Sequence, residues 1–465
     1  MSPPRGRRAA RVSPPGGRRA AASREGSRAT ARPEPASTAR SVALDVIRRV
    51  IDEGAYSNLA LARTIARAGL SERDAALASE LAYGTIRKKI PLDYALAPLL
   101  ERSIDTAPKE ARALLRLGAY QILFTRIPEH AAVSETVGLA GPRHRGFINA
   151  VLRRLVREGV RWPEGDGDED LAVRTGLGAW AIHELRLLLG DEAEAAARAL
   201  GEHSATTLRT NTCRTSVDEL EWALREAGDQ AERGALHEES LIVRAGAPTS
   251  FPGFAEGWFA VQDQASSFVV RALDPQPGER VLDACAGPGG KAAHIACLVE
   301  PEGTLIATDP SIARAGLIRS TLDRLGVRGH VLVQDARRPA VRGAFERTLV
   351  DAPCSGIGAA RRRPELLWRV QRDELSALAR LQVAIVTGVA GLLRPGGLLV
   401  YSVCTFPRAE TDAACDAILR HDAELEPADL PGPDGPAARI RLWPHRHGCD
   451  AMFVAGFRRR ETSPG

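Results

Sequence analysis

Two cysteines stand just beyond apolar, strand-like runs of the sequence. Cys354 follows TLVDAP within VDAPCSGIG, and Cys404 follows LLVYSV within YSVCTF. A hydroxyl residue comes directly after each cysteine. One such cysteine is more often a small buried apolar residue than a reactive one. Two thiols beyond two strands of one sheet favour chemistry instead, with a thiolate attacking a substrate.

A glycine-rich loop follows the first strand-like run, in the segment ACAGPGGKAAH. Its residues 287–292 match G-x-G-x-x-A, a fingerprint of dinucleotide-binding folds. Asp309 lies 19 residues after Gly290, where an acidic group binds ribose hydroxyls. The loop therefore suits an adenosine cofactor, either a nicotinamide dinucleotide or S-adenosylmethionine, and it does not fit a Walker A phosphate loop. The candidate cofactor-binding residues of the loop are Cys285, Ala286, Gly287, Pro288, Gly289, Gly290 and Lys291.

Lys291 is one of four lysines among 63 basic residues. Arginine is otherwise the default cation, so a lysine beside the glycines favours a need for a compact ammonium group. The alternative is an ordinary exposed lysine.

Five short apolar runs after residue 250 indicate a parallel sheet: RVLDAC, TLIATD, HVLVQD, TLVDAP and LLVYSV. Helical segments separate several of them, which predicts a doubly wound α/β domain over residues 246–460. One aspartate at a strand end is readily a helix cap. Four of them favour a shared ligand site: Asp283, Asp309, Asp335 and Asp351.

A thiol beside S-adenosylmethionine is typical of methylation at a carbon atom. Carbon 5 of cytosine is a poor nucleophile until a thiolate adds to carbon 6 of the ring. A free thiol is only a few per cent ionised at neutral pH, so proton transfer must assist. Asp351, three residues before Cys354, is the candidate that stabilises the adduct near the ring nitrogen. The residues alone do not show which of the two thiols is the nucleophile.

The rest of the chain divides into three parts. Residues 1–40 carry ten arginines and two glutamates, a charge of +8, so the net +5 leaves −3 for the remainder. We expect this part to be a disordered basic arm that either binds polyanions or only adds solubility. Amphipathic runs predict a helical domain over residues 41–160. Linker helices and a small α+β module are expected over residues 161–245.

The composition of the chain argues against a membrane protein, a secreted protein and a metal-binding protein. No apolar run reaches the roughly 18 residues of a membrane helix, and no signal-peptide segment follows the start. The seven cysteines form no CxxC pair, so we expect no metal site and free thiols in a reducing, cytoplasmic compartment.

Several motifs resemble the RsmB/NOP family of RNA cytosine carbon-5 methyltransferases, in the order and context typical of that family. They are DACAGPGGKAAHIA, DAPCSGIGAARRRPELLWR, LLRPGGLLVYSVCTFPRAET and HGCDAMFVAGF. The helical part resembles the NusB-like, RNA-binding domain of the bacterial Fmu/Sun/RsmB branch in IPEHAAVSETVGLA and GFINAVLRRLVREG. The resemblance implies a Rossmann-like domain that uses S-adenosylmethionine, with small-subunit ribosomal RNA as the expected substrate.

The resemblance also implies roles for single residues. Cys404 would be the nucleophile, and Cys354 would assist release of the methylated RNA. Asp309 would hold the cofactor ribose, Asp335 the adenine region, and Asp351 the cofactor edge and the target base. Gly287 stands where the family commonly has alanine.

RNA contacts are expected from two basic segments. The loop ARRRPELLWR offers phosphate contacts from Arg361, Arg362 and Arg363, and Trp368 offers a stacking surface. On the helical run, the candidates are Arg153 and Arg154. The alternatives are a solvated basic loop with a packed tryptophan, and a solvated helix face.

Two other functions fit parts of the sequence. A nicotinamide-dependent oxidoreductase would explain the glycine loop but leaves both cysteines unexplained. A non-catalytic RNA-binding assembly factor would explain the helical domain and the arm. The sequence does not determine the oligomeric state, and we favour a monomer.

Overall fold

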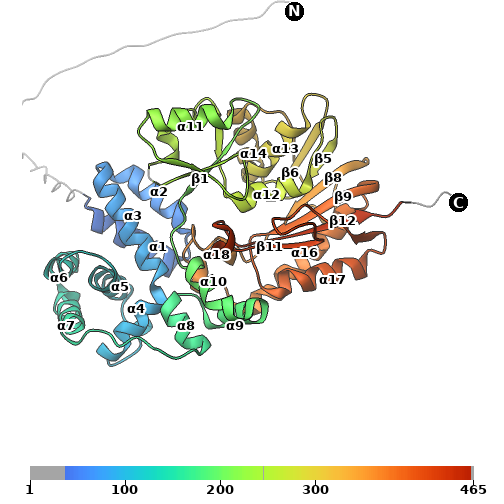
Figure 1. Cartoon of the computed structure of the whole chain (residues 1–465). Coiled ribbons are helices and arrows are strands. Elements are labelled where there is room, and N and C mark those ends of the chain that lie inside the picture. Colours follow the sequence, from blue (N-terminus) through green and yellow to red (C-terminus); the bar gives the residue numbers. More distant parts are fainter. Residues whose placement is uncertain (1–36, 245, 462–465) are drawn as a thin grey trace, which may run out of the picture. The chain divides into compact units, whose positions relative to one another are not determined.

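A computed structural model describes residues 37–244 and 246–461 (Figure 1). The predicted arm lies outside this part except for its last four residues. The predicted end of the arm at residue 40 is wrong, because helix α1 begins at Ala39. Thr38 and Ser41 form a capping box that starts the helix, since each satisfies a backbone N–H group of the other.

The predicted helical domain is present and packs around one core of aliphatic side chains. Linker helices follow it, as predicted. The helices of the domain are α1 (Ala39–Glu53), α2 (Ser57–Ala68), α3 (Glu72–Arg87), α4 (Lys89–Leu96), α5 (Lys109–Phe124), α6 (Glu129–Gly138) and α7 (Pro142–Glu158). Those of the linker are α8 (Asp168–Thr175), α9 (Ala179–Leu189) and α10 (Ala193–Leu200).

The small α+β module is an antiparallel sheet of order β2-β3-β1-β4 with one helix. Its elements are β1 (Thr206–Thr210), α11 (Val217–Glu226), β2 (Ala231–Arg233), β3 (Ser240–Val243) and β4 (Phe259–Val261). The module therefore extends past the predicted limit of residue 245, because β4 pairs with β1 through Leu208 and Val261.

One pair of cysteines departs from the expected free thiols. Cys213, just after β1, forms a disulfide with Cys297 of α13 (Gly290–Val299). The two residues are 84 positions apart in the sequence and 5.9 Å apart at their Cα atoms. Sequence spacing gave no sign of the pair, because only packing of the module against α13 brings it together.

The predicted doubly wound domain is confirmed, with an eight-stranded sheet whose main path is β10-β12-β9-β8-β5-β6-β7. All five predicted strands are present, and the pairs that they form with one another are parallel, as predicted: β5 (Arg280–Asp283), β6 (Thr304–Asp309), β7 (His330–Val333), β8 (Phe345–Asp351) and β9 (Leu393–Val403). Three strands that the sequence did not predict form an antiparallel edge beyond β9: β10 (Leu425–Pro427), β11 (Arg439–Leu442) and β12 (Met452–Arg459).

Helices cover both faces of this sheet. Val281 and Leu282 are neighbours in β5 but pack into two different cores, because successive strand residues point to opposite faces. One core includes α12 (Gln264–Leu273), α13 and α14 (Ile312–Leu325), and the other includes α16 (Leu375–Ala390) and α17 (Asp412–His421). The short helices α15 (Leu366–Arg369) and α18 (Pro444–His447) lie in loops.

Among the described residues, no helix has the length and apolarity needed to cross a membrane.

Candidate active site

The two predicted thiols lie together at the carboxyl ends of adjacent parallel strands. Cys354 comes three residues after β8, and Cys404 directly follows β9. Their Sγ atoms are 3.5 Å apart. This distance allows one thiol to donate a hydrogen bond to the other sulfur as a thiolate.

The surroundings of the two thiols shift their pKa values in opposite directions. The hydrogen bond from Cys354 lowers the pKa of Cys404, and the cations Arg363 and Lys291 act in the same direction against burial and Asp351. The pKa of Cys354 is raised well above its usual range by its bond to Cys404 and by burial. Cys404 therefore ionises first, with Cys354 as the protonated donor.

A buried carboxylate forms hydrogen bonds with both of the loops that carry the cysteines. Glu410, which is fully buried, accepts hydrogen bonds from the Ser355 backbone N–H at 2.9 Å and from the Ser355 hydroxyl at 2.5 Å. Thr405 lies 3.4 Å from the same carboxylate, and Ser355 and Thr405 bond each other at 2.7 Å. Gln382 of α16 donates a further bond at 2.9 Å. The residues that follow the two cysteines thus contact the same Glu410 carboxylate, which keeps the two sulfur atoms close to each other.

Asp351, the last residue of β8, is held by two donors. The Lys291 ammonium is 2.8 Å from Oδ2, and the Ser402 hydroxyl is 2.8 Å from Oδ1. Burial alone would lower the pKa of Lys291, but the Asp351 carboxylate outweighs it and raises that pKa. Lys291 is therefore a buried, charged partner of Asp351, and it is not the ordinary exposed lysine of the alternative interpretation.

The predicted cofactor loop runs from the end of β5 into α13. Asp309 ends β6 beside this loop, and a Cβ atom on Gly287 would lie 2.5 Å from its Oδ2 atom. Gly289 has a φ of +111° and packs against the backbone of Ile318, so glycine is required there. Gly287 thus lets the Asp309 carboxylate lie against the loop, and Gly289 allows the close approach of Ile318; an acidic group beside such a loop fits an adenosine ribose.

One cavity of about 620 Å³ connects the cofactor residues to the thiols. Asp309, Asp335, Asp351, Cys354 and Cys404 all line it. Asp335 forms an ion pair with Arg337, whose hydrogen bonds lower the pKa of Asp335 to about 2.

A second cavity of about 260 Å³ reaches Lys291 and Asp351 from the side of Asp283. Burial, reinforced by Asp351, raises the pKa of Asp283 to about 7.

The basic loop after Cys354 is largely committed to protein contacts. Arg361 donates to the carbonyl groups of Gly448 and Cys449, and Arg362 pairs with Asp263 and Asp450. The Trp368 indole N–H donates to the Ile86 carbonyl at 2.8 Å, and its ring packs against the helical-domain core. These contacts favour the packed alternative for Trp368 over base stacking.

Arg153 and Arg154 are exposed, and Arg363 is half-buried like Arg361 and Arg362. The Arg363 guanidinium lies 5.7 Å from the ring centre of Tyr56 and lines the cavity that holds Cys404. On α7, Arg153 bonds Asn149 and Arg154 bonds Glu158. Ser402, Glu410 and Tyr56 are site residues that the sequence alone did not single out.

Comparison with known proteins agrees with this geometry. Residues 270–458 match the family model described as 16S rRNA methyltransferase RsmB/F, and residues 37–157 match the NusB family. Residues 178–250 match the ferredoxin-like domain of RsmF/B-like methyltransferases. The chain is 36% identical to the probable ribosomal RNA small subunit methyltransferase B of Bacillus subtilis, over 91% of this chain and 99% of that protein. The chain belongs to the RsmB family of methyltransferases.

Other matches are consistent with this membership. The ribosomal RNA small subunit methyltransferase B of Pseudomonas putida is 36% identical over 83% of this chain and 91% of that protein. The crystal structure of PH0851 is 25% identical, with a TM-score of 0.78 over 90% of this chain and 98% of that chain. A methyltransferase homolog from Pyrococcus horikoshii is 28% identical, with a TM-score of 0.55 over 63% and 99%. S-adenosylmethionine is accordingly the cofactor, and a nicotinamide-dependent oxidoreductase is ruled out.

The hydrogen bond between the thiols predicts a pH dependence. Alkylation by iodoacetamide requires the thiolate, so its rate rises with pH through the pKa. We expect Cys404 to reach half of its maximal rate at a pH below that of an ordinary thiol, because its pKa is lowered. Cys354→Ala removes the donor and should move the curve to higher pH, whereas Cys354→Ser keeps a donor and should move it less. Mass spectrometry of the peptide that contains Cys404 measures each curve, and identical curves in all three proteins would contradict the hydrogen bond.

Proposed function

We propose that this methyltransferase acts on carbon 5 of an unpaired cytosine in small-subunit ribosomal RNA, through a covalent bond between Cys404 and the base. The observation that carries the proposal is the pair of thiols 3.5 Å apart in a cavity shared with Asp309 and Asp351. The family supports the RNA substrate, since relatives carry the name ribosomal RNA small subunit methyltransferase B.

Cys404 has the attacking role. Its thiolate forms a bond to carbon 6 of cytosine, and electron density moves to carbon 5. Bound S-adenosylmethionine supplies the electrophilic methyl group for that carbon. A base then accepts the carbon 5 proton, a role that we assign to the Asp351 carboxylate in the same cavity. The electrons of the broken C–H bond restore the double bond and expel the Cys404 thiolate.

The Lys291–Asp351 pair has a proton-handling role. Thiolate addition places negative charge on the ring nitrogen of cytosine, and a nearby proton donor lowers that barrier. The Lys291 ammonium donates a hydrogen bond to Asp351 at 2.8 Å; Lys291 lines the smaller cavity, and Asp351 lines both cavities. Ser402 fixes the other carboxylate oxygen, so the pair is oriented before the base arrives.

Cys354 has the release role. Its raised pKa keeps it protonated beside Cys404. A protonated thiol at 3.5 Å stabilises the Cys404 thiolate as it leaves. Cys354 also places a thiol beside the bond between the Cys404 sulfur and carbon 6, which must break when the adduct resolves.

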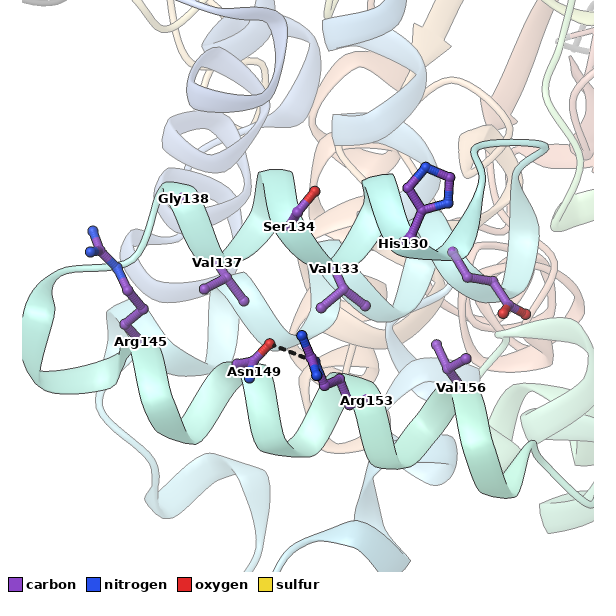
Figure 2. A pocket seen from close by; sticks show the side chains of 10 residues that line it. His130, Val133, Ser134, Val137, Gly138, Arg145, Asn149, Arg153 and Val156 are labelled. Atoms are coloured by element: carbon purple, nitrogen blue, oxygen red, sulfur yellow. Dashed lines mark hydrogen bonds between the residues drawn. The ribbon is translucent and has the colours of Figure 1, made fainter.

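A groove on the helical domain offers an RNA-binding surface away from the cavity (Figure 2). It has a volume of about 720 Å³ and lies between α6 and α7, with Val133, Val137 and Val156 along it. Arg145 lies at one end of these apolar side chains, and Arg153 lies among them beside Asn149 (Figure 2). Apolar side chains next to arginines suit unstacked bases with phosphates beside them.

Cys404→Ser tests the catalytic role directly. We expect methyl transfer to small-subunit RNA to fall by at least about 10³-fold, because a hydroxyl is a far weaker nucleophile than a thiolate. S-adenosylmethionine affinity in calorimetry should stay unchanged. Cys415→Ala, a buried cysteine of α17, is the matched control. Full turnover by Cys404→Ser, or RNA binding with no methylation by the wild-type protein, would reject the function in favour of a non-catalytic assembly factor.

Cys354→Ser is expected to trap the intermediate. Release slows because the serine hydroxyl is a much weaker acid than the thiol and stabilises the departing thiolate less, so a protein–RNA adduct should accumulate and be visible as a retarded band on a denaturing gel. The double variant with Cys404→Ser should give no such band. Rapid turnover without any adduct would remove the release role and leave the nucleophile untouched.

The groove predicts salt-sensitive binding. Arg145→Gln and Arg153→Gln should weaken RNA binding and reduce the slope of log affinity against log salt by about 0.7 for each phosphate that is no longer neutralised. Arg420→Gln, an exposed arginine at the end of α17, should leave both quantities unchanged. Equal slopes in all four proteins would show that the groove does not bind phosphates.

A further inference from the structure

A tyrosine of the helical domain reaches the catalytic cavity. Tyr56 directly precedes α2, nearly 300 residues before Cys354. Its side chain nevertheless lines the same cavity as Cys354 and Cys404. The residue is 51% exposed, so it lies where the cavity opens to solvent.

The backbone on both sides of Tyr56 is anchored to the catalytic domain. The Ser57 N–H donates to the buried Glu365 carboxylate at 3.2 Å. The Arg369 guanidinium donates to the carbonyl groups of Gly54 and Ala55, at 3.2 and 3.1 Å. These bonds fix the position of the tyrosine relative to the thiols.

The ring itself has the surroundings of a binding surface. Half of the residue is open to solvent, and the Arg363 guanidinium lies over one face of the ring, 5.7 Å from its centre, so a base would stack on the other face. An exposed aromatic ring beside a guanidinium group is the combination that binds single-stranded nucleic acid, because the ring stacks on a base and the cation faces the phosphate. Arg363 is also the arginine of this loop whose charge acts on Cys404.

We propose that Tyr56 is a substrate-positioning residue that stacks on the RNA base next to the target cytosine, with Arg363 at the adjoining phosphate. This inference rests on the proposed function, since it requires the target cytosine to enter the cavity toward Cys404. The cytosine must leave its own stack to do so, and an aromatic ring at the mouth replaces part of the stacking that its neighbour loses. The helical domain thereby completes the active site, beyond any RNA binding at its outer groove.

Steady-state kinetics with an unmodified small-subunit RNA transcript test this stack. Tyr56→Ala should raise KM for RNA about tenfold, within the range for removal of one base–aromatic stack, and should change kcat by less than about twofold. Tyr56→Phe keeps the ring and should behave as wild type. S-adenosylmethionine affinity and melting temperature should be the same in all variants. Tyr94→Ala is the matched control, because Tyr94 is a 40% exposed tyrosine of the same domain that stacks on Trp162.

Three results would overturn the stack. An unchanged KM in Tyr56→Ala would show that no base rests on the ring. Equal losses in Tyr56→Phe and Tyr56→Ala would assign the effect to the hydroxyl group. A parallel loss of cofactor affinity and melting temperature would make Tyr56 a structural residue. If the wild-type protein methylates no cytosine, the proposed function fails, and equilibrium RNA binding by the same variants still decides whether Tyr56 stacks.

Discussion

The hydrogen bond between two sulfur atoms is the constraint on which the rest of the site depends. A thiol surrounded by protein ionises with difficulty, because burial disfavours the charged form. Cys354 reverses this for Cys404 by donating a hydrogen bond across 3.5 Å. The pKa of Cys354 itself rises in return, which suits the proposed roles of Cys404 as the nucleophile and Cys354 as the proton donor. The proposed difference in role between two identical side chains thus rests on their surroundings.

The fold holds that distance through adjacent parallel strands and one buried acid. β8 and β9 pair with Asp351 opposite Ser402, so the loops that follow them start side by side. Glu410 then bonds the residue after each cysteine. Gln382 and the Tyr401 hydroxyl, which donates to the Glu410 carbonyl at 2.7 Å, fix Glu410 itself. A shift of either loop would break several of these bonds at once, which keeps the sulfurs together.

The sheet and the placement of the thiols could be predicted from sequence, because buried parallel strands are short apolar runs and their carboxyl ends share one edge. The edge strands β10 and β11 could not, since both are short and β10 ends in proline. The ranking of Cys354 and Cys404 came only from resemblance, because it depends on hydrogen bonds and nearby cations. Tyr56 and the Cys213–Cys297 bond left no local pattern, because both arise from packing between distant segments. Trp368 looked like a stacking residue in sequence, yet its indole N–H is used by Ile86.

The central claim is a transient bond between Cys404 and carbon 6 of cytosine. RNA that carries 5-fluorocytidine tests it with the unaltered protein, because fluorine on carbon 5 cannot leave as a proton does and the adduct cannot resolve. After incubation with S-adenosylmethionine, mass spectrometry should find the peptide that contains Cys404 joined to a methylated fluorocytidine. A nucleotide attached to Cys354 instead, or no attached nucleotide under conditions in which ordinary RNA is methylated, would contradict the claim.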